Sequence, residues 1–283
     1  MILLDYSSIA MSSLMVQLDK YDDEPEMIRH MIFNILRKWN SLHREEFGEM
    51  IVCFDSKNNW RREVFPEYKA SRRKGRKNSV HDWETIFKRL DEVHQEVKEY
   101  GPFRTIQVER CEADDIIGTL CEKHMTPDPI LIVSPDTDFI QLQRYPNVRQ
   151  FSNLQKKWLE PKVDPITDLE EKVLRGDTGD GVPNVMSDDN VLIEEGLRQT
   201  PLNKRKMAQL LEDPESLGTT IARRIIRNRK MIDLRRTPDD LKDEIMTRYQ
   251  DPAKGSVNRL MTLFAKNQMK MMIESLSDFE VKR

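Results

Sequence analysis

The chain has 283 residues, enough for one large hydrophobic core or for a core with a smaller appended module. With 46 basic against 49 acidic residues and a net charge of −3, its composition neither indicates nor excludes a nucleic-acid partner. Its three cysteines (Cys53, Cys111 and Cys121) lack a metal-ligand spacing and leave an odd thiol, which favours a reducing cytoplasm over a disulfide framework. No stretch approaches the roughly 20 apolar residues of a membrane span, and no basic region or long apolar run at the start indicates a signal peptide.

Short apolar runs alternate with helical patterns along the first part of the chain. The runs at 2–4, 51–54 and 130–133 are typical of strands buried on both faces, as in a parallel sheet. Between them, apolar residues recur at helical spacing over 27–39 and 86–100, and Pro25 and Gly101 fit the start of the first helix and the end of the second. This alternation predicts an α/β core over 1–165 with a mainly parallel sheet flanked by helices.

The character of the sequence changes after about residue 166. Residues 176–185 form a candidate hairpin rich in turn residues, and residues 203–248 read as helical and in places basic. We therefore expect a smaller helical region over 166–283.

Nine acidic residues stand where a strand ends, where a helix begins or in the hairpin: Asp5, Asp55, Glu112, Asp114, Asp115, Asp136, Asp138, Asp177 and Asp180. Each one alone has an ordinary explanation, as a turn residue or as a charge that complements a helix dipole. The carboxyl ends of parallel strands meet at one edge of a sheet, however, so we expect these groups to converge there. Carboxylates only a few ångström apart repel one another unless cations hold them.

The residue types favour a particular kind of metal. Oxygen ligands without histidine or cysteine fit Mg²⁺ or Mn²⁺ rather than zinc, and this number of acids suits two ions. Two such ions are the usual device for phosphodiester hydrolysis. None of the five histidines lies beside an acidic group in a recognisable pattern, so activation of water by metal is favoured over activation by histidine.

A basic segment follows Asp55, and its densest part begins at Tyr68. An aromatic residue among cations suits a nucleic-acid strand, with Tyr68 stacking on a base and Lys69 or Arg72 meeting the phosphate. A solvated loop would have the same composition, because such dense charge also repels itself. In the hairpin, Gly179 and Gly181 would let the backbone approach a phosphate or a cation, although Gly-Asp turns are common.

Six segments, in order and spacing, resemble the motifs of the flap endonuclease/5′-exonuclease family: MILLDYSS, IVCFDS, FPEYKASR, ERCEADDIIG, SPDTDFIQL and GDTGDGVPNV. The likeness extends over 1–185 and is greatest to the replication nucleases of T-even-type phages known as ribonuclease H, which are unrelated in fold to the true RNase H family. Residues 188–220 depart from the family pattern, and we expect no clamp-binding extension before Asp5.

The resemblance implies a PIN-like fold with a basic helical arch near 60–82 and a helix-hairpin-helix element near 176–195. It assigns one metal site to Asp5, Asp55, Glu112 and Asp114, and a second, looser site to Asp136, Asp138, Asp177 and Asp180. Asp115 would join them as a ligand, act through a water or serve structurally. Lys69 and Arg72 would contact the scissile phosphate, and the DNA-binding set would be Tyr68, Lys69, Arg72, Arg73, Lys74, Gly179 and Gly181. The hairpin would contact duplex backbone, with a bound K⁺ as an option.

The function that the resemblance implies is a structure-specific 5′ to 3′ exonuclease and flap endonuclease. It would remove RNA primers and 5′ flaps during lagging-strand replication by two-metal hydrolysis, leaving 5′-phosphates, and would act as a monomer in the cytoplasm. Its partners would be DNA, RNA–DNA hybrid and a single-strand-binding protein. Leu276 and Phe279 in the C-terminal tail resemble a sliding-clamp-binding peptide; the end of a Met-rich core helix is the alternative.

Three other kinds of protein share part of this pattern. A small PIN-type ribonuclease would have the acids but lack the hairpin, the arch and this length. A non-catalytic DNA-binding protein would have the basic segment with a broken set of acids, whereas here the set is intact. A phosphatase with an Asp-x-Asp nucleophile would carry that pair after the first strand, where only Asp5 is found.

Overall fold

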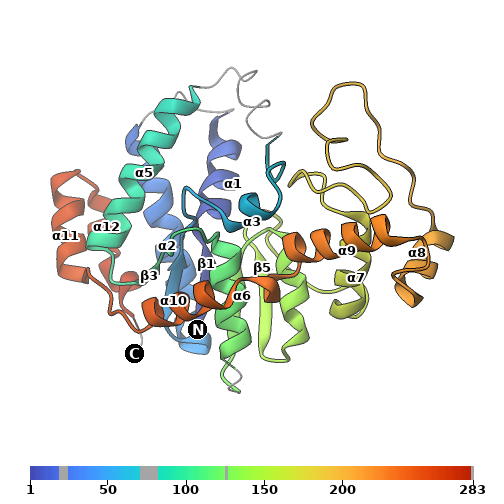
Figure 1. Cartoon of the computed structure of the whole chain (residues 1–283). Coiled ribbons are helices and arrows are strands. Elements are labelled where there is room, and N and C mark those ends of the chain that lie inside the picture. The colour runs from blue at the N-terminus through green and yellow to red at the C-terminus, as the bar shows by residue number, and fades with distance from the viewer. Residues whose placement is uncertain (19–24, 71–81, 125–126, 282–283) are drawn as a thin grey trace.

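The computed structural model describes residues 1–18, 25–70, 82–124 and 127–281 (Figure 1). These residues form a six-stranded sheet in the order β3-β2-β1-β4-β5-β6, with helices on both faces. Neighbouring strands are parallel except β5 and β6, which are antiparallel. The predicted α/β architecture with a mainly parallel sheet is therefore confirmed. No helix in the described ranges is long and apolar enough to cross a membrane.

The three apolar runs of the sequence are the central strands of the sheet. Every residue of β1 (Ile2–Asp5), β2 (Met50–Cys53) and β4 (Ile130–Val133) is buried. Side chains of a strand point alternately to its two faces, so Ile2 and Leu4 enter one hydrophobic core and Leu3 the other. Three strands were not predicted from the sequence, because they are only three to five residues long and include polar side chains: β3 (Arg104–Ile106), β5 (Val148–Ser152) and β6 (Lys157–Leu159).

Two groups of helices cover the two faces (Figure 1). The core on one side contains residues of α1 (Tyr6–Leu18), α2 (Pro25–Phe47), α5 (Trp83–Tyr100), α11 (Val257–Lys266) and α12 (Lys270–Glu274). The core on the other side contains residues of α6 (Ala113–Lys123), η1 (Thr137–Arg144), α7 (Pro165–Arg175), α9 (Thr219–Ile232), η2 (Leu234–Arg236) and α10 (Asp239–Tyr249). The two helices expected from periodicity are α2 and α5, and Gly101 caps α5 as predicted.

The region after residue 165 does not form a core of its own. Residues of α7, α9 and α10 belong to the same hydrophobic core as residues of α6. Residues of α11 and α12 belong to the core on the opposite face of the sheet. The predicted α/β part and the predicted helical part therefore share both of their hydrophobic cores.

The hairpin follows α7 directly. Asp177 and Val182 pair across it, and the expected first helix and hairpin are both present. The second helix, expected by about residue 195, is not there: residues 186–203 form turns and irregular chain, and the next helix is α8 (Lys204–Glu212).

The C-terminal tail is fastened to the protein. Phe279, in η3 (Leu276–Phe279), is fully buried, with its ring centroid 5.5 Å from that of Phe264. The Asn40 side chain donates hydrogen bonds to the carbonyl oxygens of Asp278 and Glu280, at 2.7 and 2.8 Å. Phe279 would have to leave the core to reach a partner, so the structure favours the alternative, the end of a core helix. Binding of a sliding clamp stays a prediction.

Candidate active site

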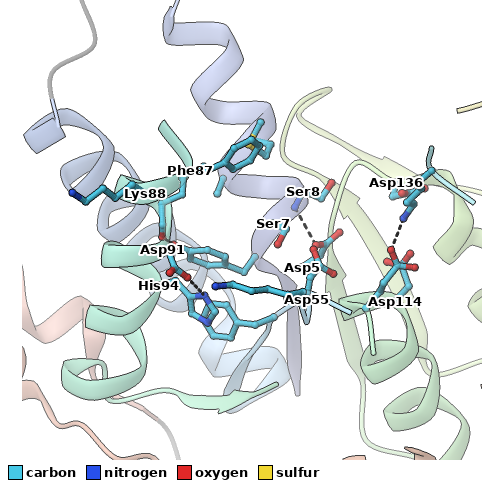
Figure 2. A pocket seen from close by; sticks show the side chains of 18 residues that line it. Asp5, Ser7, Ser8, Asp55, Phe87, Lys88, Asp91, His94, Asp114 and Asp136 are labelled. Atoms are coloured by element: carbon cyan, nitrogen blue, oxygen red, sulfur yellow. Dashed lines mark hydrogen bonds and ion pairs between the residues drawn. The ribbon is translucent and has the colours of Figure 1, made fainter. Parts of the chain in front are cut away.

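Acidic residues meet at the carboxyl edge of the sheet. β2, β1 and β4 are neighbours and run parallel, so the residues at or just beyond their ends share one edge. The start of α6 lies at the same edge. Together these elements contribute five carboxylates to the wall of one cavity of about 760 Å³ (Figure 2): Asp5, Asp55, Glu112, Asp114 and Asp136.

Local hydrogen bonds fix the orientation of these carboxylates. Asp5 accepts a bond from the backbone N–H of Ser8 at 3.1 Å and another from the hydroxyl of Ser134 at 2.9 Å. Asp55 accepts a bond of 2.7 Å from the backbone N–H of Ala113, at the first turn of α6. Two strand-end acids are thus tied to the start of α1, the end of β4 and the start of α6.

The electrostatics of the cavity disfavour several negative charges in the absence of a cation. Burial, reinforced by the charge of Asp55, raises the pKa of Asp5 to about 7. Burial, reinforced by Asp136, raises the pKa of Asp114 well above its usual value. A divalent cation would relieve this repulsion, and a donor set made only of oxygens suits Mg²⁺ or Mn²⁺.

Glu112 differs from its neighbours because it is paired with cations. Its carboxylate lies 2.7 Å from Lys69 Nζ and 3.2 Å from Arg61. Burial works against its ionisation, but Lys69 and Arg61 outweigh burial and hold the pKa of Glu112 at about 2. Within the described ranges no three acidic, histidine or cysteine side chains stand close enough together to hold a metal ion. Binding of an ion would therefore draw carboxylates such as Glu112 away from their present partners.

The four acids of the predicted second site are divided among different surroundings. Asp136 lines the cavity with the first group. Asp138 and Asp177 both form ion pairs with Lys172, at 3.1 Å for Asp177. Burial raises the pKa of Asp138 to about 7 even with Lys172 beside it. Asp180 lies near Glu112 of the first group: Lys69 Nζ is 2.7 Å from Glu112 and 3.4 Å from Asp180, and the hydroxyl of Tyr68 is 2.9 Å from each carboxylate.

Lys172 belongs to this site but was not predicted from the sequence. It stands in the last turn of α7, five residues before Asp177, where a basic residue complements the helix dipole. The available signal was its position just ahead of the Gly-Asp turn that follows α7.

Asp115 has a different environment from its acidic neighbours. It is fully buried and does not line the cavity. Its carboxylate forms an ion pair with Arg61 at 2.9 Å, accepts bonds from the side chains of Trp60 (3.2 Å) and Thr237 (2.8 Å), and caps the backbone N–H of Glu112 (2.9 Å). Because these contacts occupy both oxygens, the structure corrects the prediction of Asp115 as a metal ligand: its place is structural.

Tyr68 is not placed to stack on a base. Its side chain is only 2% exposed, and its hydroxyl oxygen lies 2.9 Å from a carboxylate oxygen of Glu112 and 2.9 Å from one of Asp180, to one of which it donates its single hydrogen. The prediction of a stacking role is therefore wrong for this structure. Lys69, which follows it, lines the cavity. Arg72, Arg73 and Lys74 lie outside the described residues, as does most of the predicted arch.

The glycines of the hairpin allow close packing against a neighbouring segment as well as the turn itself. Gly181 has φ +73° and is buried, and a Cβ there would come within 3.0 Å of the carbonyl oxygen of Glu67. The hairpin thus packs against the segment that carries Lys69, whose backbone N–H donates to the Asp180 carbonyl at 2.7 Å. Gly179 is exposed, whereas burial of Gly181 corrects its assignment to direct DNA contact.

Comparison with known protein families shows which family the chain belongs to. Residues 1–171 match the family model of the 5′-3′ exonuclease N-terminal resolvase-like domain. The chain belongs to this family. Residues 164–279 match the model of the C-terminal region of T4 RNase H. Members of this nuclease family hydrolyse phosphodiester bonds, so the chain belongs to a family of hydrolases.

Individual relatives agree with this assignment. The chain is 31% identical over 290 residues to Ribonuclease H of Enterobacteria phage T4, covering 98% of this chain and 95% of that protein. It is 28% identical to a flap endonuclease Xni of Shewanella over 64% of this chain and 67% of that protein.

Solved structures show the same fold. The bacteriophage T5 D15 flap endonuclease, in a complex with DNA and metal ions, superimposes with a TM-score of 0.63 at 19% identity, covering 88% of this chain and 99% of that chain. A T5 5′-exonuclease with bound zinc gives a TM-score of 0.59 at 18% identity, covering 89% of this chain and 99% of that chain. The predicted PIN-like core with a helical C-terminal region is thus confirmed.

Proposed function

We propose that this protein is a divalent-metal-dependent, structure-specific 5′ nuclease that cuts exonucleolytically and at flaps. The observation that carries the proposal is the single cavity in which five carboxylates and Lys69 face one another at the carboxyl edge of the sheet. Such a concentration of acids is costly to bury unless cations join it. The family relationship supports the same reaction class.

The residues of the cavity fit the ions that this chemistry needs. Asp5, Asp55, Glu112 and Asp114 would hold one Mg²⁺, and Asp136 with the more distant Asp138, Asp177 and Asp180 a second. Two such ions would activate water and neutralise the charge that develops on the phosphate. K⁺ at the hairpin stays a prediction.

The chain's own groups would position these parts. Ser134 and Ala113 hold Asp5 and Asp55 in place, so these carboxylates need little reorganisation. Lys69 is paired with Glu112, and an ion bound to Glu112 would free Lys69 to meet the scissile phosphate. Arg72, which lies outside the described residues, is proposed for the same role.

The names of the relatives support a proposal for the biological substrate. A protein named Ribonuclease H and proteins named flap endonuclease are both similar to this chain, so we propose RNA primers on DNA and 5′ flaps, removed in the cytoplasm during lagging-strand replication. We propose that the protein acts as a monomer. The predicted partnership with a single-strand-binding protein stays a prediction.

A cleavage assay tests the proposal. Flap, nicked and single-stranded substrates labelled at the 5′ end would be incubated with Mg²⁺ or with EDTA. We expect release of short 5′ fragments from the flap and nicked substrates with Mg²⁺ and none with EDTA. Cleavage in EDTA, or equal cutting of single-stranded RNA without structure preference, would contradict it; the second result would favour a PIN-type ribonuclease.

A further inference from the structure

Lys69 has a backbone conformation that L-amino acids rarely adopt. Its φ angle is +57°, in the left-handed region where the Cβ crowds the following carbonyl group. Such a conformation is unfavourable and persists only where neighbouring groups hold it. Lys69 also lines the acidic cavity, with its Nζ 2.7 Å from Glu112. The contacts that hold the backbone of Lys69 therefore help to determine where its ammonium group lies.

The hairpin supplies two such contacts. The backbone N–H of Lys69 donates to the carbonyl oxygen of Asp180 at 2.7 Å. Gly181 packs closely against the same turn: a Cβ there would lie 3.0 Å from the carbonyl oxygen of Glu67 and 3.4 Å from the backbone nitrogen of Lys69. Because Gly181 also has a φ angle of +73°, glycine is the residue that fits both this conformation and this space.

The hairpin is itself anchored to two helices. Asn228 on α9 is fully buried, and its side chain donates to the carbonyl oxygens of Val173 and Pro183, at 2.9 Å in each case. Val173 belongs to α7, and Pro183 directly follows the pairing of Asp177 with Val182. The hairpin is thus fixed to α7 and α9 on one side and contacts the turn that carries Lys69 on the other.

We propose that the hairpin is a positioning element for Lys69, and that Gly181 is a positioning residue for cleavage. The close packing at Gly181 and the hydrogen bond to the Asp180 carbonyl oxygen hold Lys69 in the left-handed conformation from which its ammonium group enters the cavity. The inference rests on the proposed nuclease function, in which Lys69 meets the scissile phosphate. It gives the hairpin an effect on the rate of cleavage that is separate from any contact with DNA.

Gly181→Ala tests the positioning role, because it pushes the hairpin away from the turn without removing a charge or a carboxylate. A displacement of about 1 Å can lower a rate by about 100-fold, so we expect kcat for flap cleavage with Mg²⁺ to fall by roughly 10- to 100-fold. Binding of the flap in EDTA, measured by fluorescence anisotropy, should match the wild type. The Mg²⁺ concentration that gives half of the maximal rate should also stay the same, since no metal ligand is changed.

Gly196→Ala is the matched control. Gly196 has a φ angle of +83°, but a Cβ there would meet nothing within 4 Å. The variant therefore introduces the same kind of backbone strain without the close contact, and its kcat should match the wild type. An equal loss of kcat in Gly196→Ala and Gly181→Ala would overturn the proposal, as would a wild-type kcat in Gly181→Ala.

Lys69→Ala shows whether Gly181 acts through Lys69. If it does, adding Gly181→Ala to Lys69→Ala should lower kcat no further, because the positioned group is already absent. A merely structural effect of Gly181→Ala would lower kcat by the same factor in both backgrounds and would overturn the proposal. A wild-type kcat in Lys69→Ala would overturn it as well.

A second variant covers the case in which Gly181→Ala does not fold. Replacing Lys69 with its α-hydroxy acid puts an ester in place of the amide, which removes the N–H donor and keeps the side chain. Loss of this hydrogen bond should lower kcat by roughly 2- to 10-fold, and an unchanged kcat would overturn the proposal. If the wild type cleaves flaps with Mg²⁺ whereas the variants contradict the expectation, only the positioning role fails; if the wild type does not cleave, the proposed function itself fails.

Discussion

At the scale of single side chains, two lysines form ion pairs with the acidic residues and partly neutralise their charge. Lys69 pairs with Glu112 and lies 3.4 Å from Asp180, and Lys172 pairs with Asp138 and Asp177. Each lysine therefore supplies positive charge where a metal ion would otherwise be required.

Replacing Lys172 with methionine tests this balance. The variant leaves Asp138 and Asp177 without their cation in a site that is largely shielded from water, so the free energy of unfolding in EDTA should fall by about 2–4 kcal/mol. Urea titrations with and without Mg²⁺ should show a larger stabilisation by Mg²⁺ in the variant than in the wild type, because an ion binds between the uncompensated carboxylates.

Arg175→Met provides the comparison for Lys172. Arg175 belongs to the same helical turn, but pairs with Glu171 at the surface and is 54% exposed. Surface pairs contribute little, so its stability and its response to Mg²⁺ should match the wild type. An equal effect of Mg²⁺ on Lys172→Met and on the wild type would contradict the role given to Lys172.

The positions of the acidic residues could be predicted from the sequence, but their hydrogen-bond and ion-pair partners could not. Asp5, Asp55 and Asp136 could be placed because each stands at or just beyond the end of a buried strand, and parallel strands end at one edge. Arg61 could not be placed, because its partner Asp115 is 54 residues away. Tyr68 was assigned to a base because it stands among cations, but only the fold shows the acceptors that its hydroxyl meets.

At the scale of elements, a buried ion pair joins three helices. Arg61, on α3 (Trp60–Val64), is 1% exposed and binds Asp115 and Glu112 at the start of α6. It also donates to the carbonyl oxygen of Met231 on α9 at 3.0 Å. The helical C-terminal region is thereby tied to a carboxylate of the cavity, which the sequence pattern of separate elements could not indicate.

Arg61→Met should destabilise the protein strongly. It leaves Asp115 charged and buried without its cation, which costs about 3–5 kcal/mol. Thermal and urea unfolding would measure the loss. Arg62→Ala, at the next and partly exposed position, should change the stability by only about 0.5 kcal/mol. Comparable losses of stability in both variants would show that the buried ion pair contributes no more to stability than a surface residue.

At the scale of the whole molecule, the C-terminal residues pack against the N-terminal part of the chain. η3 packs on α2, and Phe279 lies in the same core as β1 and α5. The sequence left two alternatives for this tail, and periodicity could not choose between them because the contacts of Phe279 come from segments far away in the chain.

Phe279→Ala should therefore reduce stability by about 3–5 kcal/mol through loss of buried apolar surface and a cavity. Met271→Ala, at a side chain that is 70% exposed, should have little effect in the same urea titration. A Phe279→Ala variant as stable as the wild type would mean that the tail is free in solution.

Asp136→Asn tests most directly whether the acidic cavity is the active site. Asparagine keeps an oxygen that can accept the bond which Asp136 receives from the Asp138 N–H, 2.9 Å long, so the fold should survive. Loss of an outer-shell partner of a metal typically costs about 10- to 100-fold, so removal of a ligand charge should lower flap cleavage with Mg²⁺ by more than about 100-fold while binding of the flap in EDTA persists. Cleavage by Asp136→Asn at the wild-type rate would mean that the acidic cavity is not the active site.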